Sequence, residues 1–255
     1  MPRFTRKSRP TRKSKLIKRA FRHHYIRNGD PQNNGEIQSG TGIIQSPTGY
    51  RYQYTYNTDG KNNYVFKGGS GRPCFILIAH PESKTGVLQS LESDLMTGRC
   101  SLNTGATTKN AGKAAMALAK EKGLTTVELT DNTMKSTATG KKFSLADMYF
   151  LTTGKTWYES FLPIRPTNPE TVERYRTIVR KNKWADVLTC FRSHVGNVII
   201  PVSTDDIDVM TEGSAMEVFK KIKASRTDFI AIYMDILPLC SGIPSLYGKT
   251  WIIDI

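Results

Sequence analysis

The stretch 107–162 constrains the fold most, because two helix patterns and two strand patterns alternate within it. In its first half, alanine and leucine recur every three or four positions, and Gly123 follows where a left-handed helix cap is favoured. Residues 126–129 alternate polar and apolar side chains, as a half-buried strand does. A second helix is expected over 145–153, and a second strand over 156–162. This order predicts the middle of an α/β (α+β) domain with a mixed sheet and flanking helices.

Further elements are predicted on both sides of that stretch. Residues 50–56 alternate strictly and place four tyrosines on one face, which favours a half-buried strand over a base-stacking surface. Asp59-Gly60 is typical of a hairpin turn, and the apolar run 73–79 predicts a central strand buried on both faces. The other expected strands are 64–66, 87–91, 99–102, 197–202, 228–236 and 251–255 (at an edge or tied to the core), and the other expected helices are 168–181, 184–193 and 212–224.

Positive charge is concentrated at the N-terminus. The chain of 255 residues has a net charge of +15, and residues 1–27 hold eleven basic side chains and no acidic one. These residues are Arg3, Arg6, Lys7, Arg9, Arg12, Lys13, Lys15, Lys18, Arg19, Arg22 and Arg27. We therefore expect a disordered basic arm over 1–27, a linker or open loop over 28–49, an α/β core over 50–165, and a C-terminal extension over 166–255 packed on the same core.

The arm predicts a polyanionic partner, because each lysine or arginine that contacts a phosphate releases a counterion and adds affinity without reading sequence. Nucleic acid or an acidic protein surface would bind residues 1–27. A nuclear-import signal and an anchor on anionic lipid are the alternatives.

The cysteines and the hydropathy pattern bear on the cellular location. Cys74, Cys100, Cys190 and Cys240 are far apart and form no CxxC pair, so we expect reduced, buried thiols and no zinc site. No apolar run approaches the roughly 18 residues of a membrane span, and no secretory signal is apparent. An intracellular protein is favoured over a mitochondrial one, despite the arginine-rich N-terminus.

Several residues are candidates for chemistry. Cys74 and His80 flank a buried strand, but core packing of Cys74 is favoured over a nucleophile–base pair. The acidic residues Asp205, Asp206 and Asp208 suit a solvated turn better than a cation site. The two GKT motifs, 154–156 and 248–250, lack the spacing and the following helix of a phosphate-binding loop. His23 and His24 only add to the charge of the arm.

Asp131 is a further candidate, since it follows a strand at the sheet edge where open α/β sheets bind ligands. The alternative is a turn residue that accepts the backbone amides of Asn132 and Thr133.

Over about residues 85–165 the chain resembles the GNAT-type acetyltransferase fold, and more specifically the uncharacterised GNAT-like proteins of large eukaryotic DNA viruses. The segments that carry the resemblance are CSLNTGATTKNAG (100–112), KAAMALAKEKG (113–123), TTVELTDN (125–132), SLADMYFLTTG (144–154) and KTWYESFL (155–162). The resemblance implies a GNAT-like mixed sheet. It places an acetyl-CoA pyrophosphate near Gly105, Lys109, Gly112 and Lys113, and Tyr158 near the position of a general acid.

The phosphate-binding loop departs from the family pattern Q/R-x-x-G-x-G/A, because Gly105 has no second glycine at the required spacing. The first hypothesis is therefore a degenerate GNAT-like domain without catalysis or cofactor, acting as a structural, capsid-associated protein in a virion or virus factory. Its arm would bind DNA and its body other virion proteins. The alternatives are an acetyl-CoA-dependent N-acetyltransferase and a cellular ribosome- or chromatin-associated protein, the last placed in the nucleus. An open slot beside residues 105–113, between splayed strands, would favour the enzyme.

Overall fold

The structure, a computed structural model, describes residues 38–58, 63–69, 72–92, 101–103, 105–137, 139–196, 213–225 and 227–255. They all belong to one compact unit, Glu36–Ile255. The basic arm, His23, His24, Asp205, Asp206, Asp208 and the strand expected over 197–202 lie outside the described residues.

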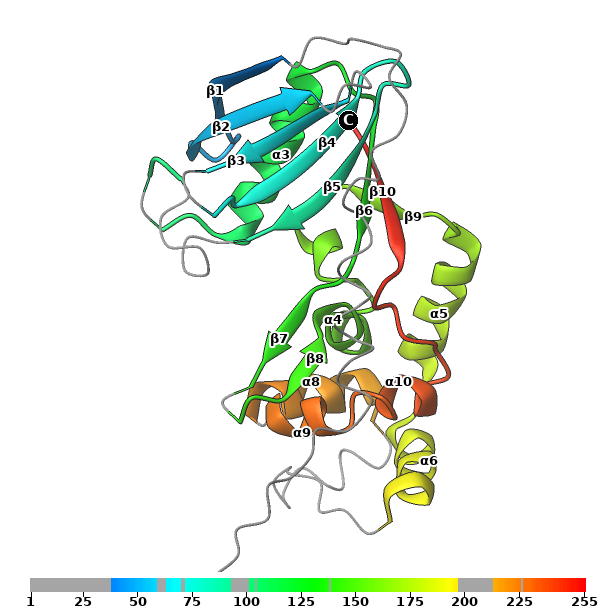
Figure 1. Ribbon diagram of the computed structural model, residues 1–255. Coiled ribbons are helices and arrows are strands. Elements are labelled where there is room, and N and C mark those ends of the chain that lie inside the picture. Colours follow the sequence, from blue (N-terminus) through cyan, green and yellow to red (C-terminus); the bar gives the residue numbers. More distant parts are fainter. Residues whose placement is uncertain are drawn as a thin grey trace, which may run out of the picture. The chain divides into compact units, whose positions relative to one another are not determined.

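The fold is mixed α/β, as expected, and is built on an eight-stranded sheet (Figure 1). All neighbouring strands are antiparallel except β5 and β6, which are parallel. In spatial order the strands are β1 (Ser39–Gln45), β2 (Arg51–Thr58), β3 (Tyr64–Gly68), β4 (Phe75–His80), β5 (Thr85–Leu91), β6 (Thr126–Thr130), β10 (Thr250–Asp254) and β9 (Ile164–Pro166).

Helix α3 (Thr108–Glu121) crosses one face of this sheet and closes the first hydrophobic core (Figure 1). Thr107 caps it in a capping box with Asn110, and Gly123 follows with a left-handed φ of 72°. The buried side of α3 is mostly alanine, which lets the helix backbone approach the strands closely. The expected helix is confirmed, with Gly123 just after its end.

A second hydrophobic core lies among the remaining helices. They are α4 (Leu145–Thr153), α5 (Pro169–Lys181), α6 (Trp184–Val195), α8 (Ala215–Ser225), α9 (Thr227–Ile232) and α10 (Leu237–Cys240), with a small sheet of β7 (Met134–Ser136) and β8 (Lys142–Ser144). β10 serves both cores, since Trp251 packs in the second and Ile253 in the first. The second core therefore contains residues of both the expected α/β core (50–165) and the expected C-terminal extension (166–255).

The start of α4 has only half of a capping box. The Ser144 hydroxyl accepts the backbone N–H of Asp147, at 3.1 Å, as an N-cap should. The Asp147 carboxylate instead accepts the hydroxyl of Ser245 at 2.6 Å and the backbone N–H of Leu246. This buried carboxylate therefore joins α4 to the segment that leads into β10.

Strand β1 lies in the stretch that was expected to be a linker or open loop. It pairs with β2 along its whole length, and the rings of Tyr54 and Tyr56 lie across it. A Cβ atom on Gly40 or Gly42 would come within 2.4–2.7 Å of those rings, so any larger residue there would displace them. Gly40 and Gly42, which lie in the expected loop, therefore leave the space in which the rings of Tyr56 and Tyr54 pack.

Two expected strands are helical turns instead. Residues 157–162 form a turn around the 3-10 helix η1 (Tyr158–Ser160), because the Glu159 carboxylate accepts the N–H of Thr156 and the Thr156 hydroxyl accepts the N–H of Glu159. Within 228–236, α9 and a turn replace the strand. Phe229 and Tyr233, one helical turn apart, both pack their rings against Phe191 of α6. A short apolar run does not separate these two possibilities. The strand expected at 99–102 is also absent from its described part, since residues 101–103 form a bend.

The expectation of reduced thiols is wrong for the described cysteines. Cys190 and Cys240 form a disulfide, and Cys74, which is fully buried as expected, is disulfide-bonded as well. The wide spacing of the cysteines in sequence gave no indication of these bonds, because disulfide pairing depends on distance in space. In the described part of the chain, no helix has the length and apolar character needed to cross a bilayer.

Candidate functional site

The parallel strands β5 and β6 separate toward their carboxyl ends. Their pairing runs from Thr85 with Thr126 to Leu88 with Leu129, whereas β5 itself continues to Leu91. In Figure 1 the two strands start side by side and then diverge. The last residues of β5 therefore have one strand edge that the described residues of β6 do not pair with. A gap opens between the two strands at this point.

A pocket of about 420 Å³ fills this gap. One wall is the end of β5, 88–92, and the opposite wall is the end of β6 with the residues that follow it. Thr108 at the start of α3 and the aromatic pair Trp157 and Tyr158 complete the lining. The volume lies within the range of small-molecule sites, roughly 300–1,000 Å³.

Tyr158 brings a phenol into this pocket. Its ring is held against Trp157 and Phe161 at centroid distances of 4.9 and 5.7 Å, and its hydroxyl accepts a hydrogen bond of 3.0 Å from the Thr133 hydroxyl. Burial raises the pKa of Tyr158 to about 12, and the negative charge of Asp131 adds to this effect. The phenol therefore stays protonated at neutral pH, and its own hydrogen is available to a ligand.

Asp131 lies directly behind this pair. It is fully buried, its Oδ1 atom accepts the backbone N–H of Thr133 at 3.2 Å, and its Oδ2 atom has no hydrogen-bond partner among the described residues. Burial raises the pKa of the carboxyl group from 3.8 to about 6, and the nearby Asp147 carboxylate also raises it. The backbone of Asp131 is paired on both sides with the turn before β10, through Lys249 and Gly248.

The alternative interpretation of Asp131 as a turn residue is confirmed for the amide of Thr133. The amide of Asn132 bonds to Thr130 instead. Asp131 itself does not line the pocket. It is connected to the pocket by Thr133, whose amide bonds to Asp131 and whose hydroxyl bonds to Tyr158.

The residues expected at a pyrophosphate gather around the start of α3. Gly105 has a left-handed φ of 80° and open space around it, and the backbone of Lys109 and Lys113 belongs to the first two turns of the helix. Gly112 has a different role, because a Cβ atom there would lie 3.0 Å from Phe161 and 3.4 Å from Leu91. It allows α3 to pack closely against the pocket wall.

The positive end of the α3 dipole thus lies beside the pocket, with Thr108 in its lining.

Neither a protein-family model, nor a curated protein, nor a solved structure matches this chain. The geometry of the pocket therefore carries the functional argument.

The other candidates do not form a catalytic site. Cys74 is disulfide-bonded and His80 bonds to Asn63 at 2.7 Å, so a nucleophile–base pair is excluded. Gly154 caps α4 with a left-handed φ, and the second GKT motif enters β10, so neither motif forms a phosphate-binding loop.

Sequence reasoning missed Thr133 and the end of β5. Thr133 belongs to no recognisable motif. Its role depends on hydrogen bonds to Asp131 and Tyr158, which are distant from each other in sequence. The one available signal was its position just after a strand at the expected ligand edge.

Proposed function

We propose that this chain is an N-acyltransferase that uses the thioester of coenzyme A in the pocket between β5 and β6. The observation that carries the proposal is the separation of the one parallel strand pair in the described sheet, which opens a lined pocket beside the start of α3. An open slot at this place was the condition under which the enzyme was favoured over a structural protein.

The shape of the pocket suits an extended ligand that carries amides. Residues 89–91 of β5 continue past the ladder with β6, so their edge can pair with a ligand as it would with another strand. The pantetheine arm of coenzyme A is such a ligand, since two amides lie along an extended chain. Its phosphates would then lie near the start of α3, where the helix dipole and the side chains of Lys109 and Lys113 favour negative charge.

Tyr158 would supply the proton that the reaction needs. The amine nitrogen attacks the thioester carbonyl carbon, the C–N bond forms and the C–S bond breaks, while the amine releases a proton to water. The sulfur leaves as a thiolate and takes the phenolic proton of Tyr158, which the bond from Thr133 orients. Solvent then returns a proton to the phenolate.

The test is acetyl transfer by the full chain. Acetyl-CoA is supplied with spermidine or a lysine-rich peptide as acceptor, and mass spectrometry detects the acetylated amine together with free coenzyme A. We expect both products in equal amounts. Release of coenzyme A no faster than uncatalysed hydrolysis, with either acceptor, would argue against an acyltransferase.

A second function is proposed for the N-terminal arm, on the observation of eleven basic residues and no acid in 1–27. We propose that the arm binds nucleic acid through its phosphates, which would bring the folded domain to nucleic-acid-bound targets. The location in a virion or virus factory rests on the resemblance described above and stays a prediction.

A further inference from the structure

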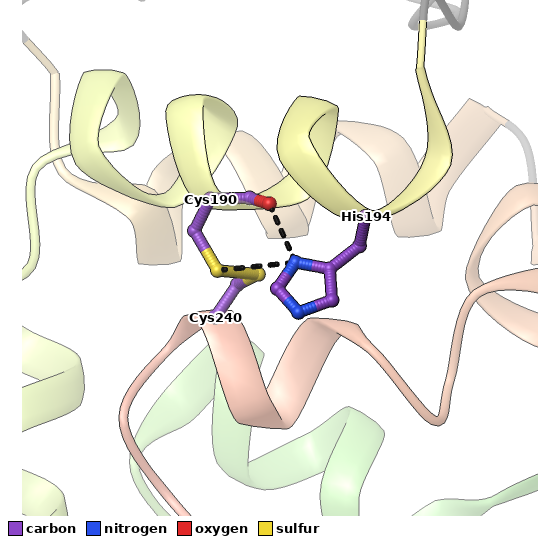
Figure 2. A group of neighbouring side chains, drawn as sticks. All are labelled: Cys190, His194 and Cys240. Carbon is purple, nitrogen blue, oxygen red and sulfur yellow. Dashed lines mark hydrogen bonds between the residues drawn. A yellow bond between two sulfur atoms is a disulfide. The ribbon is translucent and has the colours of Figure 1, made fainter.

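A cluster of two cysteines and one histidine lies at the contact of α6 with α10, away from the pocket. Cys190 on α6 is disulfide-bonded to Cys240, the last residue of α10, with the Cα atoms 5.5 Å apart (Figure 2). His194 follows Cys190 by one helical turn, so both side chains project from the same side of α6.

His194 is held beside the sulfur atoms. Its Nδ1 atom lies 3.9 Å from the Cys190 sulfur and 2.9 Å from the backbone oxygen of Cys190, to which the ring donates. The Ser193 hydroxyl, 3.2 Å from the same nitrogen, adds a further contact. The imidazole is exposed and the two cysteines are half-buried, so an ion or a reductant in solution can reach the cluster.

The three side chains have the chemistry and the spacing of a soft-metal site. One ligand atom from each of them lies within 4.8 Å of the others. Thiolate sulfur and imidazole nitrogen are the ligands that Zn²⁺ prefers, at metal distances of about 2.3 and 2.1 Å. Ligands of one tetrahedral ion lie about 3.5–3.8 Å apart at those bond lengths, so reduction of the disulfide and small side-chain rotations are sufficient.

We propose that Cys190, His194 and Cys240 form a redox-gated zinc site, closed by the disulfide and opened by a dithiol reductant. In the opening step, one thiolate of the dithiol attacks a sulfur of the Cys190–Cys240 disulfide and a mixed disulfide forms. The second thiol of the reductant resolves it. Two electrons pass to the chain, the reductant leaves as a cyclic disulfide, and two protein thiols remain.

Zinc binding then converts these thiols to thiolates. The two thiol protons pass to solvent, the unprotonated ring nitrogen of His194 donates its lone pair, and water takes the fourth position of the tetrahedron. The site thus joins α6 to α10 in either state, by a disulfide under oxidising conditions and by zinc under reducing ones. This contact matters for the proposed pocket, because the chain after α10 leads to the Asp147 and Asp131 contacts.

The test uses Co²⁺ as a spectroscopic substitute for Zn²⁺ on the full chain, before and after reduction with a phosphine. Mass spectrometry after thiol alkylation verifies that Cys190 and Cys240 are reduced. We expect one equivalent of Co²⁺ to give thiolate-to-metal charge-transfer absorption in the reduced chain, none in the oxidised chain, and displacement by Zn²⁺. The Cys240→Ser variant should lose this absorption.

His194→Ala separates a three-ligand site from a pair of thiols and changes only an exposed side chain. Its Co²⁺ affinity should fall by at least about tenfold, since loss of even an indirect partner costs about 10–100-fold. The matched control is His80→Ala, on β4, which should bind as the unmodified chain does. Absence of charge-transfer absorption in the verified reduced chain would overturn the proposal. So would an unchanged affinity of His194→Ala, or absorption that persists in Cys240→Ser.

Discussion

The buried carboxyl group of Asp131 gives the sharpest stability prediction. The side chain is fully buried, and its Oδ2 atom has no hydrogen-bond partner among the described residues. Because burial disfavours the charged form, the pKa rises from 3.8 to about 6 in the folded chain. The Asp131→Asn variant keeps the shape of the group and an oxygen for the amide of Thr133, but carries no charge.

The sign and size of the effect follow from proton linkage. Between pH 4 and pH 6 the folded chain holds a proton that the unfolded chain has released, so the free energy of unfolding falls as the pH rises. The folded pKa lies about two pH units above the ordinary value, and each pH unit corresponds to about 1.36 kcal/mol. Asp131 therefore costs the folded state roughly 3 kcal/mol above pH 7, and almost nothing below pH 4.

The assay is urea unfolding of the two chains at several pH values between 4 and 8. We expect the difference in unfolding free energy, the Asp131→Asn variant minus the unmodified chain, to rise by roughly 2–3 kcal/mol across this range. The matched control is Asp254→Asn on β10. Its exposed carboxylate pairs with Arg165 at 2.8 Å, which holds the pKa below its usual value, so a small effect of opposite sign is expected. A difference for Asp131→Asn that does not change with pH would refute the buried-charge account.

Three further predictions concern the pocket, the ion pair between α5 and η1, and the arm. Tyr158→Phe removes a hydroxyl from the pocket, so the acetyl-transfer kcat should fall by about 10²–10⁴ while acetyl-CoA binding, measured by calorimetry, is unchanged. Arg176→Ala removes the guanidinium that binds Glu159 and the backbone oxygen of Gly154; urea unfolding should show a loss of about 3 kcal/mol, because the half-buried carboxylate loses its cation and keeps only the amide of Thr156, and a loss below about 1 kcal/mol would contradict this. Deletion of residues 2–27 should abolish DNA binding and its salt dependence at unchanged stability, and an unchanged salt slope would refute the arm assignment.

Local signals were sufficient for much of the fold. The α3 helix was predicted from its alanine periodicity and from Gly123, both of which the structure confirms. The central strand β4 and the strands β2, β5 and β6 were predicted from apolar runs and alternation. Each of these elements is determined mainly by residues that are close together in sequence, so a local pattern is sufficient to predict it.

The remaining elements depend on partners that are distant in sequence. β1 is a strand because its glycines lie beneath the tyrosine rings of β2. The Cys190–Cys240 disulfide joins residues 50 positions apart. No window of local sequence contains both members of such long-range pairs.

The candidate site was only partly predictable for the same reason. Asp131 was selected from the sequence by its place at a strand end, whereas Tyr158 and the residues at the start of α3 were selected by the resemblance to the acetyltransferase fold. Their arrangement around one pocket depends on where β5 and β6 stop pairing. That point is a property of the whole sheet.

The measurement that tests the central claim most directly is acetyl-CoA binding to the full chain, by calorimetry and thermal shift, with one wall of the pocket altered. Gln89 is exposed and lines the pocket at the end of β5, so Gln89→Trp should fill the slot, whereas Gln53→Trp places the same side chain at an exposed position on β2.

We expect acetyl-CoA to stabilise the unmodified chain and Gln53→Trp by about 2.7 kcal/mol at a hundredfold excess over Kd, and to leave Gln89→Trp unshifted. The absence of any shift at millimolar acetyl-CoA, or an equal shift in Gln89→Trp, would contradict the assignment of this pocket.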